Sequence, residues 1–502
     1  MHKETVTSAN LRSPARIRTR AGLSVACSLA VTAGVLGPVA AASQAVAAPA
    51  AKAPAPAKAK AKDPEAAIIK KAQNGSLYTA GKSLYGPLTA TRATVSTASA
   101  HSRIKRLVGK RLKNKAVGKT YSYVVTDVAT GKSISGRGSR TGRLTASTMK
   151  IMTASAALQT FGPDYQFSTK VVVLGKGKVA LVGGGDATLT RSNLSTLSSR
   201  VAKELKKDAA KGDASTIAPE PGKALELYVD DSMYVAPSKP GGWTNSYQPY
   251  IVRPVRALGT LGYYGWDSTV NAANYFRDRL KVHLKNSGIK YTSNKNVTRT
   301  RAAKTAQVVS DFKGVPLSSQ IYSFLQPSEN NIGEMLFRNV AHAKGYSTSW
   351  AGSRTAVRNV LSRELKIPLA NTRIDDGSGV ARTDRLTPIA LTTALRRAAD
   401  RKNYPKLWPI YYGGSLPLSG RTGTLSSGSG RFNTRPTVCA RGKVRAKTGT
   451  LFDTIGLAGL TVGRDGKLKA FAFLVNKRPQ RYSPLQTRRI VDRGAATVNG
   501  CY

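Results

Sequence analysis

Residues 147–161 read STMKIMTASAALQTF, and this stretch decides how the chain is interpreted. Apolar residues recur in it at the spacing of one helix face, which predicts a helix from Ser147 to Phe161. Ser147 and Lys150 stand three positions apart at its start, so their side chains share a face. A neutral lysine can accept a serine proton, and burial lowers a lysine pKa toward that state. The pair is therefore a candidate nucleophile and base.

The pattern S-x-x-K is weak evidence by itself because serine and lysine are abundant here. Further copies begin at Ser102, Ser287 and Ser310. They fall in a predicted linker, at a helix end and before a Lys-Gly turn. Only the copy at Ser147 opens a long amphipathic helix, which would fix the geometry of the two side chains.

Two further motifs follow in order along the chain. Residues 328–330 read Ser-Glu-Asn, between two predicted helices, and residues 447–450 read Lys-Thr-Gly-Thr, at the start of a predicted strand. A lysine at a strand edge can bind a substrate carboxylate, and Gly449 leaves room for a substrate against the strand. The backbone N–H groups of Thr450 and Ser147 could form an oxyanion hole. The near-copy at 421–424 (RTGT) has no strand pattern after it, and we favour 447–450.

Predicted strands lie early and late, with helices between them. Residues 121–128 alternate as a strand, and 455–462 and 468–475 are apolar strands joined by an Arg-Asp-Gly turn. Residues 170–182 predict a further β-hairpin, and 483–497 predict a closing helix. This order favours an α+β fold in which the N- and C-terminal segments share one sheet.

Composition limits the classes of function that the chain can have. The chain of 502 residues has 79 Lys+Arg against 26 Asp+Glu, a formal net charge of +53. A protein with this charge could bind nucleic acid, an anionic membrane surface or another anionic polymer. Four histidines and three cysteines make a Cys/His zinc site improbable, and they weaken any Ser-His-Asp hydrolase.

The N-terminus indicates export. A basic segment ending at Arg20 precedes an apolar stretch at 21–39, and A-x-A sites follow at 40–42 and 45–47. Residues 1–47 therefore predict a signal peptide, with a membrane anchor as the alternative, and export argues against a nuclear or ribosomal role. Residues 48–103 predict an Ala/Pro/Lys-rich, largely disordered linker. Outside the cell, Cys439 and Cys501 predict one disulfide.

The ordered set S-x-x-K, S-x-N, K-T-G resembles the penicillin-recognising serine enzymes, which comprise D-Ala-D-Ala peptidases, transpeptidases and serine β-lactamases. Segments 181–190 (LVGGGDATLT), 230–232 (DDS) and 376–388 (DGSGVARTDRLTP) are similar to the low-molecular-mass class C penicillin-binding proteins, peptidase family S13. The resemblance covers residues 104–502. It implies a D-alanyl-D-alanine carboxypeptidase that can also act as an endopeptidase.

The resemblance also implies a fold. The family has a penicillin-binding-protein transpeptidase or β-lactamase-like fold, a five-stranded antiparallel sheet flanked by helices plus a helical region. It inserts β-rich structure between S-x-x-K and S-x-N. We expect the catalytic domain at 104–165 and 266–502, and a shortened β-rich insertion at 166–265.

The motifs shared with the family indicate which residues of this chain form the site, and the resemblance implies no metal or organic cofactor. The expected catalytic residues are Ser147, Lys150, Ser328, Asn330 and Lys447. The expected substrate-binding residues are Thr448, Gly449, Thr450, Asp376 and Arg382. Trp243 and Tyr250 could line a pocket for the substrate side chain or could belong to the core. The implied partners are peptidoglycan stem peptides ending in D-Ala-D-Ala, β-lactams as covalent inhibitors and anionic wall polymers, without nucleic acid.

Three alternatives remain at this stage. A serine β-lactamase on the same fold is disfavoured because the E-x-x-L-N element of class A enzymes is missing and the insertion is large. A non-catalytic, cationic wall-binding protein would not need the intact motifs. A secreted nucleic-acid binder would explain the charge but none of the ordered motifs, and no aromatic-plus-basic motif supports it.

Overall fold

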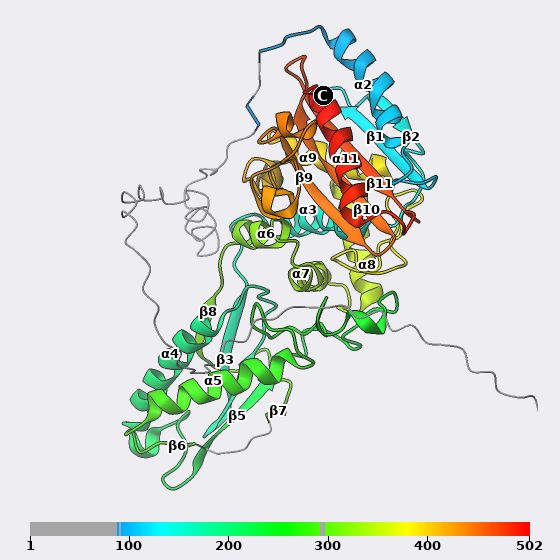
Figure 1. The fold of residues 1–502 in the computed structure, drawn as a ribbon. Helices are drawn as coiled ribbons and strands as arrows, with labels where there is room; N and C mark the ends of the chain where they lie inside the picture. The colour runs from blue at the N-terminus through cyan, green and yellow to red at the C-terminus, as the bar shows by residue number, and fades with distance from the viewer. Residues whose placement is uncertain (1–87, 90–91, 292–296, 502) are drawn as a thin grey trace, which may run out of the picture. The chain divides into compact units, whose positions relative to one another are not determined.

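The structure is a computed structural model that describes residues 88–89, 92–291 and 297–501 (Figure 1). The predicted signal peptide and most of the predicted linker lie outside these residues and stay predictions. Along the described part of the chain, no helix combines the length and apolar character needed to span a membrane.

A five-stranded antiparallel sheet joins the two ends of the described chain. Its strand order is β2-β1-β11-β10-β9. The strands are β1 (Tyr121–Asp127), β2 (Ser133–Arg137), β9 (Val444–Leu451), β10 (Thr454–Val462) and β11 (Leu468–Val475). β1 pairs with β11 from Tyr121 opposite Val475 to Asp127 opposite Lys469. The prediction that N- and C-terminal segments share one sheet is therefore confirmed, together with the antiparallel five-stranded architecture.

Helices cover both faces of this sheet (Figure 1). α2 (Thr97–Leu112) and α11 (Pro484–Asn499) bury apolar side chains such as Val108 and Val491 with Phe473 of β11. α2 begins at Thr97, capped by Ser96, so the end of the segment 48–103 is helical and the prediction of a largely disordered linker is wrong for residues 97–103. On the other face, α9 (Pro388–Ala399) packs on β1 and β11 and leads into the helical region.

The helical region is formed by short and long helices from the middle of the chain. It contains η1 (Ala146–Met149), α3 (Lys150–Phe161), α6 (Leu317–Leu325), α7 (Asn330–Ala343), α8 (Trp350–Asn359), the π-turn η4 (Val360–Glu364) and α10 (Trp408–Tyr411). α3 is buried along most of its length because it packs against α6, α7 and α9. This central position makes α3 a rigid support for the residues at its start.

A second sheet lies between α3 and α6 in the sequence. Its order is β6-β5-β4-β3-β8, and β7 also pairs with β5. The strands are β3 (Ser168–Gly175), β4 (Lys178–Val182), β5 (Ala224–Asp230), β6 (Lys290–Tyr291), β7 (Thr298–Arg299) and β8 (Val308–Lys313). α4 (Arg191–Ala209) and α5 (Ser268–Leu284) pack together on it through apolar side chains.

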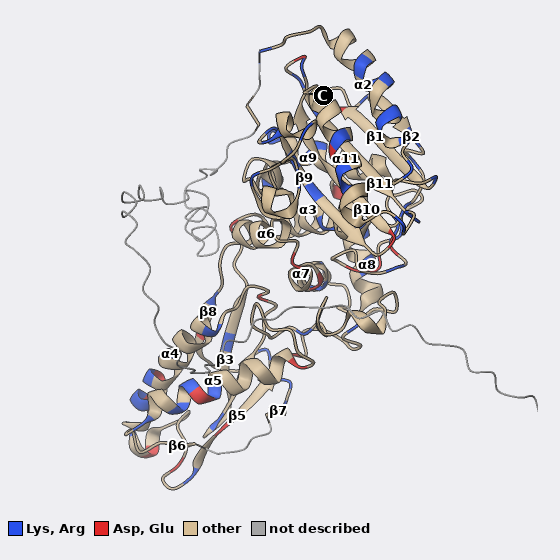
Figure 2. Cartoon of the chain, in the orientation of Figure 1, with Lys and Arg blue, Asp and Glu red and all other residues tan. Residues whose placement is uncertain are grey.

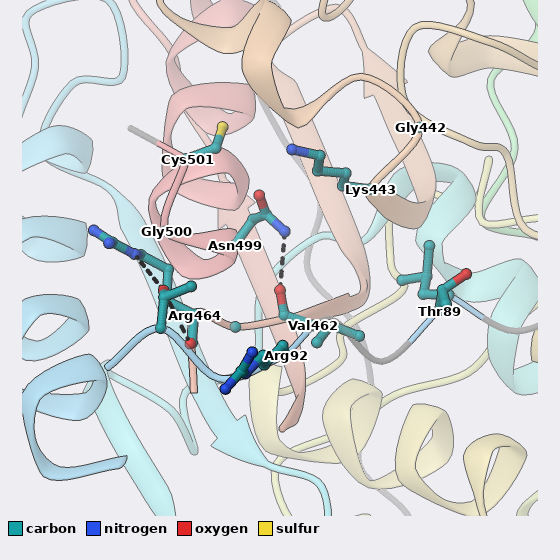
Figure 3. A pocket seen from close by; sticks show the side chains of 12 residues that line it. Thr89, Arg92, Gly442, Lys443, Val462, Arg464, Asn499, Gly500 and Cys501 are labelled. Atoms are coloured by element: carbon teal, nitrogen blue, oxygen red, sulfur yellow. Dashed lines mark hydrogen bonds between the residues drawn. The ribbon is translucent and has the colours of Figure 1, made fainter. Parts of the chain in front are cut away.

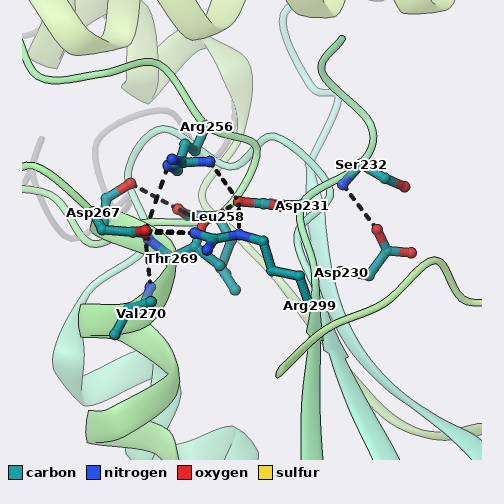
Figure 4. Close-up of polar contacts among 10 residues, drawn as sticks. Asp230, Asp231, Ser232, Arg256, Leu258, Asp267, Thr269, Val270 and Arg299 are labelled. Atoms are coloured by element: carbon teal, nitrogen blue, oxygen red, sulfur yellow. Dashed lines mark hydrogen bonds and ion pairs between the residues drawn. The ribbon is translucent and has the colours of Figure 1, made fainter. Parts of the chain in front are cut away.

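Pairing in this sheet continues past residue 265, where the sequence places the end of the insertion. β8 returns to pair with β3 in the register Ser168 opposite Lys313. Ion pairs also tie the start of α5 to the strands: Arg299 of β7 contacts Asp267 at 2.6 Å and Asp231 at 3.2 Å (Figure 4). We therefore propose that the inserted domain runs to Lys313.

Candidate active site

Ser147 lies in the short helix η1, immediately before α3. Its neighbours Ala146, Thr148 and Met149 are buried, whereas Ser147 is partly exposed. Ala146 has a φ of 45°, in the left-handed region that costs a residue with a side chain about 1–3 kcal/mol. The backbone just before Ser147 is also held in place. Asn476, the residue after β11, makes two hydrogen bonds with the Leu144 backbone, at 2.9 and 3.0 Å. The surrounding structure thus holds Ser147 in place.

Lys150 is the first residue of α3, and its side chain is fully buried. Its Nζ lies 2.9 Å from Ser147 Oγ, 2.7 Å from Asn330 Oδ1 and 2.9 Å from the carbonyl oxygen of Ser378. Burial lowers the pKa of Lys150 to about 8, although the nearby Glu334 and Asp376 act in the opposite direction. A neutral amine in contact with the serine hydroxyl is therefore accessible near neutral pH, as a general base requires.

The S-x-N motif connects α6 to α7. Asn330 is the first residue of α7, and its Nδ2 donates to the Ile251 carbonyl oxygen at 2.7 Å, so its Oδ1 faces Lys150. Ser328 stands at a φ of 67° and is partly exposed. Among the described residues, its side chain has no hydrogen bond with the other motifs. Of these two motif residues, Asn330 hydrogen-bonds Lys150 and Ser328 does not.

Lys447 lies on β9 and is fully buried. Burial, followed by the positive charge of Lys150, lowers its pKa well below the usual value. Its Nζ donates to the Thr448 carbonyl oxygen at 3.1 Å. Thr448 Oγ1 contacts Thr424 Oγ1 at 2.7 Å. The segment 421–424 therefore lies beside the K-T-G motif, which the sequence did not indicate.

At Gly449, β9 packs closely against the backbone around Ser147. A Cβ at this position would lie 2.8 Å from the Thr145 carbonyl oxygen and 3.3 Å from the Ser147 nitrogen. Glycine is needed here because β9 packs against η1. This reason differs from the one given by the sequence, in which Gly449 leaves room for a substrate. Thr450, the next residue on β9, is exposed.

The Asp-Gly-Ser-Gly segment forms a buried turn between η4 and α9. Asp376 is fully buried and accepts hydrogen bonds from the Gly379 and Ala381 N–H groups, both at 2.7 Å, and from Trp243 Nε1 at 2.8 Å. Its contacts thus hold the turn and Trp243 together. Tyr250, in contrast, is 77% exposed.

Arg382 makes a bidentate ion pair with a carboxylate absent from the predicted site. Its two terminal nitrogens donate to Asp453 at 2.8 and 3.0 Å, in the turn between β9 and β10. Any contact of Arg382 with a substrate carboxylate would compete with this pair. Asp453 lies three residues after Thr450, but nothing in the sequence pattern marks it.

The sequence did not lead us to predict Glu334 as a residue of the site. It is fully buried and accepts hydrogen bonds from the Gly377 and Ser378 N–H groups, at 2.8 and 2.9 Å. It stands four positions after Asn330, one turn further along the same helix face, and this spacing could have suggested it. The Ile251 contact uses only a backbone carbonyl, for which a sequence offers no signal.

Cys439 and Cys501 form a disulfide with their Cα atoms 5.6 Å apart. It fastens Cys501, which follows Gly500 after the end of α11, to a 3₁₀ turn before β9. A cavity of about 330 Å³ adjoins it, lined partly by Arg92, Lys443 and Arg464 (Figure 3). None of the predicted catalytic residues lines this cavity.

Within the described ranges, no group of three or more His, Cys, Asp or Glu residues has an arrangement able to hold a metal ion.

Comparison with known proteins identifies the family. A family model described as the D-Ala-D-Ala carboxypeptidase 3 (S13) family matches residues 105–263 and 260–497. The chain belongs to this family. Carboxypeptidase DacB of Mycolicibacterium smegmatis is 28% identical over 384 residues, which cover 75% of this chain and 80% of that protein. A D-alanyl-D-alanine carboxypeptidase of Actinomadura sp. is 24% identical over 441 residues, covering 72% and 78%.

A solved structure supports the fold of this S13 family member. Penicillin binding protein 4 (dacB) from Haemophilus influenzae superimposes with a TM-score of 0.63 at 19% identity, covering 78% of this chain and 98% of that one. The predicted penicillin-binding-protein fold is therefore confirmed. With the family established, the protein is a serine-type D-Ala-D-Ala carboxypeptidase, as the ordered motifs predicted.

Proposed function

We propose that this carboxypeptidase trims peptidoglycan stem peptides through an acyl-enzyme on Ser147. The observation that carries the proposal is the 2.9 Å contact between Ser147 Oγ and the buried Lys150 Nζ. A buried lysine with a lowered pKa, in contact with a partly exposed serine, is the arrangement that a lysine-activated nucleophile needs.

In the first step, Ser147 Oγ attacks the carbonyl carbon of the penultimate D-Ala, and its proton passes to Lys150. The tetrahedral intermediate collapses and the C–N bond breaks. The proton held by Lys150 reaches the leaving nitrogen through Ser328, with Lys447 behind it, so that the terminal D-Ala leaves as an amine and Lys150 is neutral again. Water then attacks the Ser147 ester. This second step releases the shortened peptide as a carboxylic acid and restores the serine.

Other residues would hold the substrate. Asn330 would orient its peptide amide, and Lys447, Thr448 and Thr450 would bind its terminal carboxylate. An arriving carboxylate would favour the charged form of Lys447, opposing the effect of burial. The same chemistry with a cross-linked side chain as the leaving amine would make the enzyme an endopeptidase.

The test is to incubate the purified protein with labelled penicillin and to locate the adduct by mass spectrometry. We expect slow turnover and a stable adduct on Ser147 that Ser147→Ala abolishes. An adduct that survives this substitution would refute the mechanism. Rapid penicillin hydrolysis would move the assignment to a β-lactamase. Release of D-Ala from a stem-peptide analogue measures the carboxypeptidase reaction directly, and its absence would favour a non-catalytic wall-binding protein.

We also propose that the enzyme is exported and binds anionic wall polymers through the face that contains α2. Residues 92–126 contain lysines and arginines but no acidic residue, and Asp127 is the sole acidic residue in the sequence from 92 to 163. Asp127 is buried and accepts a hydrogen bond from Lys469 at 2.7 Å, so it leaves the surface charge uncompensated. Basic residues recur along α2 in Figure 2.

The character of this face favours a hydrophilic polyanion over a membrane. In the described part of 92–143, no large hydrophobic side chain is exposed, whereas helices that lie in a membrane interface insert such side chains. The salt dependence of binding to a soluble polyphosphate tests the proposal. Replacing exposed lysines of this face by glutamine (Lys105, Lys110, Lys113 and Lys115) should weaken binding. A matched set on and after α4 (Lys203, Lys206, Lys207 and Lys211) should not, and equal losses would refute a dedicated face.

A further inference from the structure

We propose that Glu334 is a positioning residue for the lysine base, acting through the Gly377–Ser378 turn. The proposal rests on the acyl-transfer function above, in which Lys150 must present a lone pair to Ser147. It assigns a task to a buried carboxylate that the mechanism itself does not use.

The contacts of Lys150 define how its lone pair is directed. The Ser378 carbonyl oxygen and Asn330 Oδ1 can only accept hydrogen bonds, whereas Ser147 Oγ can also donate. A neutral amine has two N–H bonds and one lone pair. When both N–H bonds point to the two acceptors, the lone pair faces Ser147. Displacing either acceptor would leave the lone pair without a fixed direction.

Each acceptor is itself held in place by neighbouring groups. The Ile251 carbonyl oxygen accepts from Asn330 Nδ2, which directs Oδ1 toward the lysine. Glu334 holds the other acceptor, since its two carboxylate oxygens accept from the successive N–H groups of Gly377 and Ser378. These two bonds fix the two peptide groups that lead to the Ser378 carbonyl, whose own peptide group donates from the Gly379 N–H to Asp376.

Close packing leaves the turn little freedom to compensate. A Cβ at Gly377 would collide with the Gly333 carbonyl oxygen of α7, and one at Gly379 would collide with the Ala146 carbonyl oxygen of η1. The turn is therefore confined between the helix that carries Glu334 and the short helix that carries Ser147. A change at Glu334 should be transmitted to the nucleophile rather than absorbed.

Charge couples Glu334 to the base as well. Burial and the neighbouring Asp376 raise the pKa of Glu334, while the two N–H donors favour its ionised form. The carboxylate is the leading influence that opposes the lowering of the Lys150 pKa by burial. The other charged groups that face this pair are Asp376 on the turn, Glu329 before α7, Arg338 on α7 and Lys447 on β9.

The experiment measures the acylation rate by labelled penicillin against pH in the full-length protein. Glu334→Gln removes the charge and replaces one acceptor oxygen with an NH₂ group that cannot accept from the backbone. We expect the plateau rate to fall roughly 10–100-fold, as misplacement of a catalytic group does. The acidic limb should move to lower pH because the carboxylate no longer raises the Lys150 pKa.

Glu334→Asp separates position from charge, because it keeps the carboxylate but is one methylene shorter. Its plateau should fall while its acidic limb stays where the wild-type limb lies. Glu364→Gln is the matched control: this exposed carboxylate pairs with Lys344 outside the site and should leave both readouts unchanged.

Rates are normalised to the number of sites that label after long exposure, which removes any contribution from misfolded protein. A normalised Glu334→Gln rate equal to the wild-type rate, or an acidic limb that does not move, overturns the proposal. Labelling that persists in Ser147→Ala would overturn the acyl-transfer function instead, whatever the Glu334 variants do.

Discussion

The catalytic region and the second sheet place their charged side chains differently. Around Lys150, the carboxylates of Glu334 and Asp376 and the ammonium of Lys447 are fully buried. In the second sheet, the charges near α5 form ion pairs at the surface, such as Arg299 with Asp267 (Figure 4). Burying a charge is costly and shifts its pKa, whereas an exposed pair changes little. Charge buried around Lys150 is therefore expected to affect the acylation rate, whereas charge at the surface near α5 is not.

The largest expected effect is loss of the base. Lys150→Met keeps an unbranched side chain of similar length but removes the amine. The acylation rate by penicillin should fall roughly 10²–10⁴-fold, the usual contribution of general base catalysis. Stopped-flow or gel-based labelling measures the rate, and the thermal unfolding midpoint checks that the variant is folded. A folded variant that labels at the wild-type rate would contradict the assigned role.

The next effect tests a buried charge that lies outside the site. Arg431 and Asp492 form a buried bidentate pair between the segment before β9 and α11. Asp492→Asn leaves the guanidinium unpaired, so the free energy of unfolding should drop by about 3–5 kcal/mol. The acylation rate per folded site should not change. Denaturant titration measures the first quantity, and a loss of rate per folded site would break the separation between structural and catalytic charges.

A smaller effect concerns pH. Because only neutral Lys150 accepts the proton, the acylation rate should decline as pH falls below the lysine pKa of about 8 and level off above it. Glu334, Asp376 and Glu329 raise this pKa, and burial lowers it. A rate that keeps rising to the ordinary lysine value of 10.5 would show that burial does not tune the base.

The smallest effect is expected in the second sheet. Arg299→Gln removes exposed ion pairs with Asp267 and Asp231, which should cost no more than about 1 kcal/mol of unfolding free energy. The acylation rate should stay at the wild-type value. A loss of several kcal/mol would mean that these surface pairs stabilise the inserted domain as strongly as the buried pair stabilises the catalytic region.

Sequence patterns anticipated the elements whose signal is local. The helical segment at 147–161 and the hairpin of β10 and β11 follow from periodicity and turn chemistry, although Ser147 lies in η1 and the α-helix itself begins at Lys150. The five-stranded sheet was implied by the resemblance to the family. The start of α2 was missed because residues 97–103 contain only alanine and polar side chains, and the cap at Ser96 lies in a Ser/Thr-rich stretch. The return of β8 to β3 was also missed, since a short strand carries no record of its distant partner.

In the site, the motif residues were predictable because the motifs mark side chains with the functional groups that acyl transfer needs. Lys150 and Asn330 do meet, as the S-x-x-K and S-x-N motifs imply. The contribution of Ile251 was not predictable, since any residue supplies the same carbonyl. Asp453 lies on a turn whose direction depends on the packing of β9 against η1, and only the folded chain shows that it reaches Arg382.

The pairing of β1 with β11 links catalytic competence to completion of the chain. Tyr121 pairs with Val475, and Asn476 immediately after β11 holds Leu144, three residues before the nucleophile. Contacts so distant in sequence form late and slowly. A polypeptide still emerging from the ribosome has no β11, so it has neither the central sheet nor the support for Ser147. A fragment that stops before residue 468 lacks β11 and the residue that holds Leu144, so it should bind no penicillin.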